Sequence, residues 1–362
     1  KRKGIEKITI LEKNPACGME ASNAAAGMLA PQSEADRDDS FFRFCSESRD
    51  LYPQFAEEIL CETGVDIELD RAGTLYLASN EKDAAELEKR YLWQKAANLS
   101  IEKLSAREIL EIEPNISRKV LFGLSFPNDW QVENRKIIEA LDLQLKKHGE
   151  NQTESRVQII NGEVGALIFE NNKVIGAKTN HGKFFAEKII IASGAWTSLI
   201  KDRFDLLSSV KVKPLRGQML EFSEKTNLFR RVVYTPRGYI VPRKNGRILV
   251  GATVEDAGFD CRVTLAGTDD LLEKAIEISP RFANLNLKNS WAGLRPFAPD
   301  GLPVLGEFPG IENLYAATAH YRNGILLAPK TSEILADKIT GGEDSEYLKI
   351  FSPLRFAAAG AF

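Results

Sequence analysis

The stretch from Trp291 to Pro329 reads W-A-G-L-R-P-F-A-P-D-G-L-P-V-L-G and, after a short loop, N-L-Y-A-A-T-A-H-Y-R-N-G-I-L-L-A-P. Its second half predicts a strand of small residues that ends in a polar turn and opens an apolar helix at Gly324. Such a junction brings free backbone N–H groups and the positive end of a helix dipole to one place, which suits an anion. The stretch therefore predicts an anion-binding helix end.

Arg295 stands in the apolar first half of the same stretch. A guanidinium group keeps its charge, so an arginine in apolar surroundings needs an anionic partner from the protein or from a ligand. A carboxylate substrate next to an anionic cofactor would meet this need. The alternative is an internal ion pair between Arg295 and Asp300, with an ordinary helix start after the strand.

The composition is ordinary for a globular chain. It has 362 residues, of which 43% are apolar and 27% charged, and a net charge of −3. This length suffices for two domains or for one large domain with an insertion. The charge balance and the lack of a long basic run argue against a nucleic-acid partner. No apolar run approaches the roughly 20 residues of a membrane span, so no membrane-crossing segment is expected.

Cysteine and histidine are scarce. The cysteines lie far apart and without metal-like spacing, which predicts small buried thiols in a reducing, cytoplasmic environment and no metal site: Cys17, Cys45, Cys61 and Cys261. Two of the three histidines, His148 and His181, precede glycine in what we expect to be polar turns. Histidine acid–base catalysis is therefore not expected.

The N-terminal residues predict the basic end of a helix, a cap at Gly4 and a buried strand that ends at Glu12. In a dinucleotide-binding βαβ unit, an acidic residue at this place binds the ribose hydroxyls. The matching Gly-rich loop would lie about 20 residues earlier, so we expect it and the first strand upstream of residue 1. The alternative is that the motif is absent.

Residues 17–31 are rich in small side chains. Such a segment either lets the backbone lie close to a ligand or forms an Ala-rich helix in the core.

The rest of the chain alternates between helical and extended patterns. Residues 36–110 are mostly helical, with strands expected at 64–69 and 73–78, and an amphipathic helix follows up to Gly149. Residues 157–179 predict a short β-meander. The run I-I-I-A-S-G-A-W is typical of a buried parallel strand, and residues 207–254 alternate as antiparallel strands do.

Four blocks of this sequence resemble the D-amino-acid oxidase superfamily of FAD-dependent amine oxidases, and within it the glycine oxidases of the thiamin-thiazole pathway. They are M-E-A-S-N-A-A-A-G-M-L-A-P, I-I-I-A-S-G-A-W, G-Y-I-V-P-R-K-N-G-R-I-L-V-G-A-T, and W-A-G-L-R-P with H-Y-R-N-G-I-L-L-A-P. The resemblance implies an α/β (α+β mixed) fold with a discontinuous, Rossmann-like FAD-binding domain (1–35, 150–205 and 293–345) and a mostly antiparallel, helix-backed substrate domain (36–149 and 206–292).

The resemblance also implies site residues. Arg295 would bind the substrate carboxylate, with Tyr239 and Arg322 beside it, and no side chain would act as an acid or base. Non-covalent FAD would contact a longer set: Glu12, Lys13, Ala21, Ser22, Ala26, Gly27, Met28, Val164, His320, Tyr321, Arg322, Asn323, Gly324, Ile325 and Leu326. One departure is Ala319, which stands where close relatives often have glycine.

The expected function is the oxidative deamination of glycine, sarcosine and small D-amino acids, with O₂ as electron acceptor and H₂O₂ as product, serving thiamin thiazole synthesis. The sequence leaves two alternatives open. One is a D-amino-acid dehydrogenase that passes electrons to a quinone, and the other is a flavin-fold binding protein without cofactor. Whether the chain forms a homo-oligomer is equally open.

Overall fold

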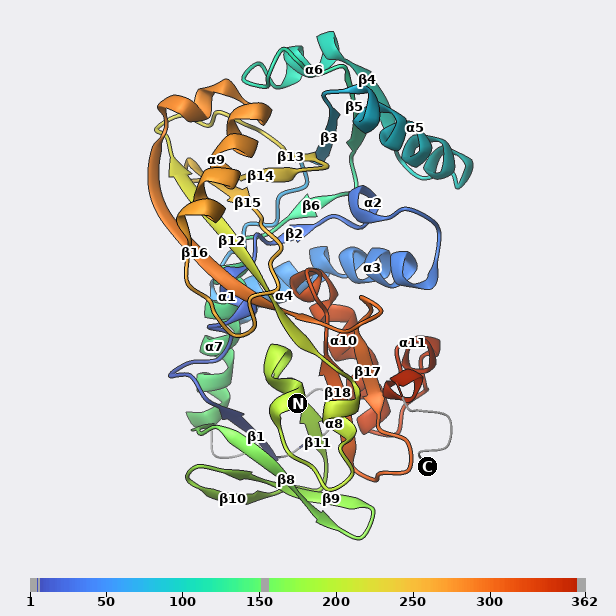
Figure 1. Ribbon diagram of the computed structural model, residues 1–362. Coiled ribbons are helices and arrows are strands. Elements are labelled where there is room, and N and C mark those ends of the chain that lie inside the picture. Colours follow the sequence, from blue (N-terminus) through green and yellow to red (C-terminus); the bar gives the residue numbers. More distant parts are fainter. Residues whose placement is uncertain (1–4, 6, 151–155, 357–362) are drawn as a thin grey trace.

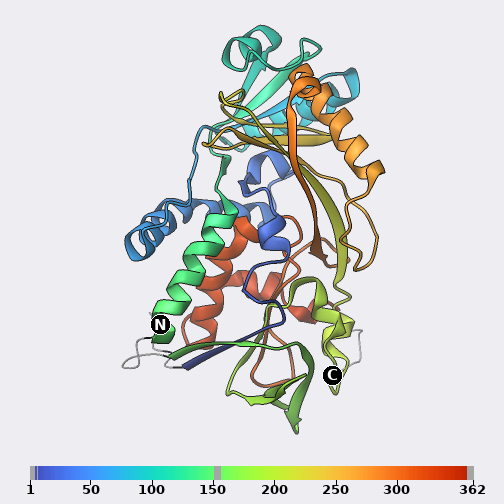
Figure 2. The same ribbon diagram turned by 90° about the vertical axis from the view of Figure 1, so that its left-hand side faces the viewer.

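The computed structural model describes residues 5, 7–150 and 156–356. Figure 1 shows a large sheet with helices at one end of the molecule, several small sheets at the other, and a layer of helices between them. Figure 2 shows the long helices α7 (Asn134–Glu150) and α10 (Gly324–Ile339) in this middle layer. This mixed α/β architecture agrees with the predicted fold class.

The large sheet has eight strands in the order β16-β12-β15-β14-β13-β3-β5-β4. All neighbours pair antiparallel except β13 and β3, which are parallel. In chain order its strands are β3 (Thr74–Ala78), β4 (Glu102–Ser105), β5 (Phe122–Phe126), β12 (Lys213–Ser223), β13 (Val232–Thr235), β14 (Gly238–Pro242), β15 (Arg247–Gly251) and β16 (Asn286–Phe297).

Helices cover this sheet because each has one apolar face. α9 (Leu265–Ile278) buries Leu271, Ala275 and Ile278, which are spaced by three or four residues, in one apolar cluster with β12, β14 and β15. α5 (Glu81–Ala96) and α6 (Ala106–Ile112) lie at the other end of the sheet (Figure 1). The predicted mostly antiparallel, helix-backed sheet is therefore present.

Most of the small sheets lie at the opposite end, whereas the pair formed by Met28–Leu29 and Trp130–Gln131 lies next to the large sheet (Figure 1). β11 (Ile189–Ile191) pairs parallel with β18 (Leu314–Thr318), which pairs antiparallel with β17 (Val304–Glu307). A meander and two strand pairs complete the set: β8 (Val164–Glu170), β9 (Lys173–Thr179) and β10 (Gly182–Phe185); β1 (Lys7–Glu12) with β7 (Arg156–Asn161); and β2 (Met28–Leu29) with β6 (Trp130–Gln131).

The middle helical layer is held by an apolar core. α10 (Gly324–Ile339) packs on α3 (Ser40–Asp50) and α4 (Tyr52–Thr63), where Phe44, Tyr52 and Leu327 are fully buried. The remaining helices are α1 (Ala21–Ala24), α2 (Pro31–Glu34), α7 (Asn134–Glu150), α8 (Leu206–Ser209), α11 (Glu346–Ile350) and the 3₁₀ helices η1 (Gly194–Leu199), η2 (Pro280–Asn284) and η3 (Pro353–Phe356).

Three secondary-structure predictions are wrong. Residues 64–69 form no strand, because Asp66 accepts a hydrogen bond from the Glu68 amide (2.8 Å) and Glu68 adopts a left-handed φ of 56°. His148 lies inside α7 and not in a turn, whereas His181 does lie in a turn. The strand 157–160 leaves the meander and pairs parallel with β1. The predicted helix end at residues 1–4 lies outside the described residues.

Three burial predictions also fail. β1 is half-exposed, because β7 is its only strand neighbour among the described residues. In β11 only Ile191 is buried, since Ile190 faces a cavity. Cys45 is buried, but Cys61 and Cys261 are exposed and Cys17 is intermediate, so only one of the four thiols fits the predicted burial. None of the described helices is long and apolar enough to span a membrane.

Candidate active site

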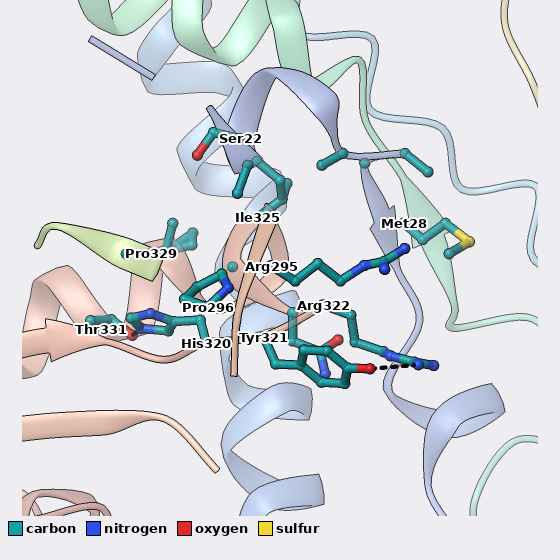
Figure 3. Close-up of a pocket in the computed structure, with 18 of the residues that line it drawn as sticks. Ser22, Met28, Arg295, Pro296, His320, Tyr321, Arg322, Ile325, Pro329 and Thr331 are labelled. Atoms are coloured by element: carbon teal, nitrogen blue, oxygen red, sulfur yellow. Dashed lines mark hydrogen bonds between the residues drawn. The ribbon is translucent and has the colours of Figure 1, made fainter. Parts of the chain in front are cut away.

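A cavity of about 1730 Å³ lies between the large sheet and the middle helices. Its wall includes the small-residue segment around α1 and β2, the cavity face of β12, β14 and β16, and one side of α10 with the turn before it. Further residues of the lining come from β1, α4, α7, β7 and β11. Figure 3 shows Arg295 and Arg322 reaching into it, with Met28 on one wall and His320 near Thr331 on another.

The segment between α1 and β2 is held close to its neighbours. Gly27 has a φ of +67°, and a Cβ atom there would lie 2.1 Å from the carbonyl oxygen of Val132. Arg243 donates a hydrogen bond to the Ala26 carbonyl (2.7 Å), and Trp291 donates to the Ala24 carbonyl (3.0 Å). The segment therefore presents a rigid, nearly bare backbone to the cavity, which is one of the two roles that the sequence suggested.

The turn before α10 uses left-handed backbone at two non-glycine residues, Ala319 (φ 58°) and Tyr321 (φ 50°). Alanine at position 319 thus occupies a conformation that glycine adopts more easily. α10 then starts at Gly324 as predicted, with no side-chain cap and no acidic residue in its first turn. Its first amides, which have no partner inside the helix, line the cavity and suit a negatively charged group.

Arg295 lies on the cavity face of β16, where glycine makes room for it. A Cβ atom at Gly217, on the adjacent strand, would lie 2.2 Å from the guanidinium. Arg295 donates one hydrogen bond to the Thr253 carbonyl (3.0 Å) and forms no ion pair with any described carboxylate. The suggested pair with Asp300 is absent because Asp300 pairs with Arg355 (2.6 Å). The charge of Arg295 is therefore available to a ligand.

Aromatic hydroxyls and a carboxylate surround the second arginine. Tyr234 donates a hydrogen bond to Glu34 (3.1 Å), and the Tyr234 and Tyr239 rings lie 5.5 Å apart. Burial would lower the pKa of Arg322, but Glu34 and Tyr234 raise it above its ordinary value. Burial raises the pKa of Tyr239, despite the opposing effect of Arg295 and Arg322. Tyr239 is therefore a neutral hydrogen-bond donor at neutral pH.

His320 is no acid–base candidate in this cavity. Burial lowers its pKa to about 4, so the ring is neutral at neutral pH, and its Nε2 lies 3.1 Å from the Thr331 hydroxyl. Among the described residues, no group of three histidine, cysteine or acidic side chains is arranged to hold a metal ion. The arrangement can hold an anion and orient a small ligand, and the Glu34 carboxylate lies in its wall.

Most of the predicted site residues line this one cavity. Arg295, Tyr239 and the residues 21, 22, 26–28 and 320–325 all do so. Glu12 and Lys13 lie at the end of β1 outside the lining, where Lys13 pairs with Glu20 (3.1 Å). Val164 begins β8 and Leu326 is buried in the core, and neither lines the cavity.

Among the wall residues that the sequence-based prediction missed, three lie at the charged groups: Glu34, Gly217 and Tyr234. Gly217 could have been found from the sequence, because a glycine inside a strand with alternating polarity often marks a place where a ligand or another part of the protein lies close to the backbone. Glu34 and Tyr234 carried no such signal, because they are 200 residues apart in the chain and meet only in the fold.

Comparisons with known proteins identify the family of this chain. The sequence profile of the FAD dependent oxidoreductase family (DAO) matches residues 1–338, so the chain belongs to this family. It is 34% identical over 360 residues to the glycine oxidase of Geobacillus kaustophilus, covering 96% of this chain and 90% of that protein. The crystal structure of glycine oxidase from that organism superimposes with a TM-score of 0.88 at 32% identity, covering 97% and 93% of the two chains.

Another relative is longer than this chain. The bifunctional protein ThiO/ThiG of Trichormus variabilis is 33% identical over 364 residues, which cover 97% of this chain and 51% of that protein.

The described residues suit FAD. The segment at Gly27 admits no side chain and leaves backbone exposed to a ligand, and the uncapped start of α10 offers amides and a positive dipole end to an electron-rich ring edge. The residues that would hold FAD here are Ala21, Ser22, Ala26, Gly27, Met28 and those from His320 to Ile325.

Proposed function

We propose that this protein catalyses the FAD-dependent oxidative deamination of glycine and other small amines. The observation that carries the proposal is the guanidinium of Arg295, which faces the cavity without a carboxylate partner among the described residues and lies beside the α10 start. A bidentate pair with a substrate carboxylate would satisfy it. The printed names of the relatives support glycine as the substrate.

The residues of the chain would act by position and charge. Arg295 would hold the substrate carboxylate, and Tyr239 would donate a hydrogen bond to the same ligand. FAD held by the residues named above would supply the two-electron oxidation of the substrate amine to an imine, with O₂ as the final electron acceptor and H₂O₂ as product. We expect no side chain to act as a general base: the phenol of Tyr239 stays protonated, the buried His320 is a weak base, and the Glu34 carboxylate already accepts a hydrogen bond from Tyr234. Water would hydrolyse the resulting imine to glyoxylate and ammonia.

The finer features of this proposal rest on the family resemblance and on the residues. We expect FAD to be held non-covalently, because residues 1–147 contain no histidine and residues 262–362 no cysteine, the residue types with which tethering relatives hold the flavin. Residues 1–35, 150–205 and 293–345 form the cofactor domain and 36–149 with 206–292 the substrate domain. The enzyme works in the cytoplasm and serves thiamin thiazole synthesis.

A substrate series measured by H₂O₂ release tests the proposal. Met28, Tyr239 and the strand before His320 narrow the space around Arg295, so a longer side chain has less room. We expect kcat/KM to fall from glycine to D-alanine to D-valine and D-phenylalanine, because an overfilled site costs about 1–3 kcal/mol. Faster turnover of D-phenylalanine than of glycine would contradict it. Glycine turnover with a quinone acceptor but without H₂O₂ would indicate the dehydrogenase.

A further inference from the structure

A second arginine lies directly behind Arg295. Arg216, on β12, pairs in the sheet with Leu294, whereas Gly217 pairs with Gly293 on the face that carries Arg295. Because side chains alternate along a strand, Arg216 and Arg295 project from opposite faces of the same strand pair. Arg216 is buried, with 6% of its surface exposed, and lies outside the cavity lining.

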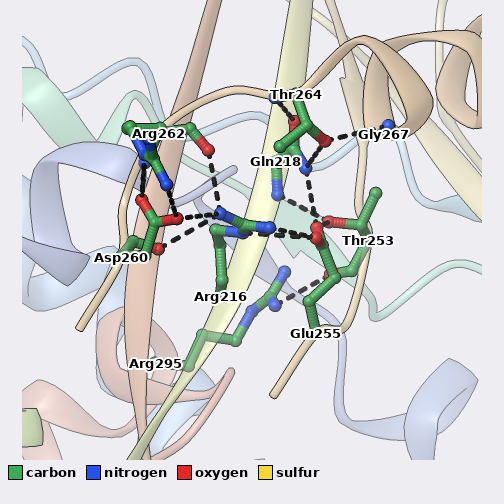
Figure 4. Close-up of polar contacts among 9 residues, drawn as sticks. All are labelled: Arg216, Gln218, Thr253, Glu255, Asp260, Arg262, Thr264, Gly267 and Arg295. Carbon is green, nitrogen blue, oxygen red and sulfur yellow. Dashed lines mark hydrogen bonds and ion pairs between the residues drawn. The ribbon is translucent and has the colours of Figure 1, made fainter. Parts of the chain in front are cut away.

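Arg216 holds two carboxylates, as Figure 4 shows. Its Nη2 and Nε atoms lie 2.6 Å and 3.2 Å from Glu255, and its Nη1 lies 3.3 Å from Asp260. Asp260 has a second cation, Arg262, at 2.9 Å. Glu255 has no second cation within ion-pair distance among the described residues, and Gln218 donates to it (2.8 Å). Of the two carboxylates, Glu255 therefore depends on Arg216 alone for charge compensation.

One residue links Glu255 to the cavity. The Thr253 hydroxyl donates a hydrogen bond to Glu255, and the Thr253 carbonyl accepts the hydrogen bond of Arg295 (3.0 Å). The half-buried Glu255 carboxylate and the unpaired Arg295 guanidinium thus contact the same residue (Figure 4). An uncompensated charge in such surroundings is strongly drawn to an opposite one.

We propose that Arg216 is a positioning residue for substrate binding: it retains Glu255 on the far face of the sheet and so keeps Arg295 free for the carboxylate of the substrate. The inference rests on the proposed function of Arg295. Without Arg216, Glu255 would turn to Arg295 through the shared Thr253 and compete with the substrate as an internal carboxylate. Removing the charge of Glu255 as well would end this competition.

The test is a double-mutant cycle on the FAD-loaded protein with Arg216→Gln, Glu255→Gln and the double variant. We expect Arg216→Gln to raise KM for glycine roughly tenfold with kcat changed less than about threefold, the signature of lost substrate binding. The double variant should return KM to the value of Glu255→Gln, because neighbouring residues couple non-additively. The exposed Arg262→Gln is the matched control and should leave KM unchanged.

Acetate binding, followed by the change it causes in the flavin spectrum, gives a readout that does not need turnover. Its Kd should rise in Arg216→Gln and recover in the double variant. If Arg216→Gln does not fold, Arg216→Lys replaces it, with and without Glu255→Gln. We expect KM for glycine and Kd for acetate to rise about threefold in Arg216→Lys, because lysine keeps the charge but loses the planar guanidinium fork.

Two results overturn the proposal. One is an unchanged KM for glycine and an unchanged Kd for acetate in a folded, yellow Arg216 variant. The other is a double variant whose fold-increase in KM equals the product of the fold-changes in the two single variants. A wild-type protein that binds acetate with the expected pattern but does not oxidise glycine refutes the proposed function and leaves the role of Arg216 standing.

Discussion

Arg295 and Arg322 show how single residues define this site. Each carries a permanent charge into a cavity walled largely by apolar side chains, and among the described residues neither forms an ion pair with a carboxylate. The apolar context of Arg295 was visible in the sequence and predicted a ligand-binding role. The electrostatic influence of Glu34 on Arg322 was not visible there, because it depends on how α2 lies against β13 in the fold.

Replacing Arg295 by lysine should impair the use of substrate more than the binding of FAD. Lysine keeps the charge but loses the planar fork that matches a carboxylate. The loss of a charge-assisted hydrogen bond, about 1.5–3 kcal/mol, predicts a fall in kcat/KM of roughly ten- to a hundred-fold. Steady-state kinetics and a FAD titration measure the two effects. An unchanged KM for glycine would leave Arg295 with a structural role only.

Replacing Tyr239 by phenylalanine should have a modest effect. Burial keeps the Tyr239 phenol neutral, so only one hydrogen bond to the substrate is lost, which predicts a decrease in kcat/KM of about tenfold. An obligatory proton acceptor would contribute roughly 10²- to 10⁴-fold. A loss in that larger range, measured with saturating FAD, would assign Tyr239 to proton transfer and contradict the mechanism without a base.

At the scale of elements, the junction of β18 and α10 was the most predictable part of the molecule. Small residues, a polar turn and an apolar helical period all favoured the same structure, and the helix starts at Gly324 as expected. The strand predicted at residues 64–69 is absent, because the alternation of apolar and polar residues there also fits an irregular segment that buries Ile67. The bends at Ala319 and Tyr321 have no sequence signal of their own, since glycine occupies neither position.

The pH dependence of stability should report on the turn before α10. His320 has a folded pKa of about 4 and an unfolded pKa of about 6.5. Between these values the unfolded chain binds the proton that the folded protein excludes, so the stability contributed by the neutral ring is present above about pH 6.5 and is lost as the pH falls toward 4.

Urea unfolding of wild-type and His320→Gln proteins at about pH 7 and pH 4.5 measures this contribution. The wild type should lose about 2 kcal/mol more than the variant over this interval. His181→Gln, in an exposed turn, is the matched control and should behave as the wild type does. Equal losses in wild-type and His320→Gln proteins would mean that His320 titrates normally.

At the scale of the whole molecule, the cavity exists only because distant segments meet. Its wall combines residues near positions 25, 217, 239, 295 and 322, which belong to the small-residue segment, the large sheet and the turn before α10. The sequence indicated the chemistry of several of these segments through local patterns and a family resemblance. Their convergence could not be predicted from local patterns, because long-range packing decides which faces of the strands and helices meet.

The most direct test of the central claim is the visible spectrum of the FAD-loaded protein before and after glycine is added without oxygen. We expect an oxidised flavin spectrum that is bleached by glycine and restored, with release of H₂O₂, when air is admitted. A protein that binds FAD but keeps its oxidised spectrum in the presence of glycine would contradict the account.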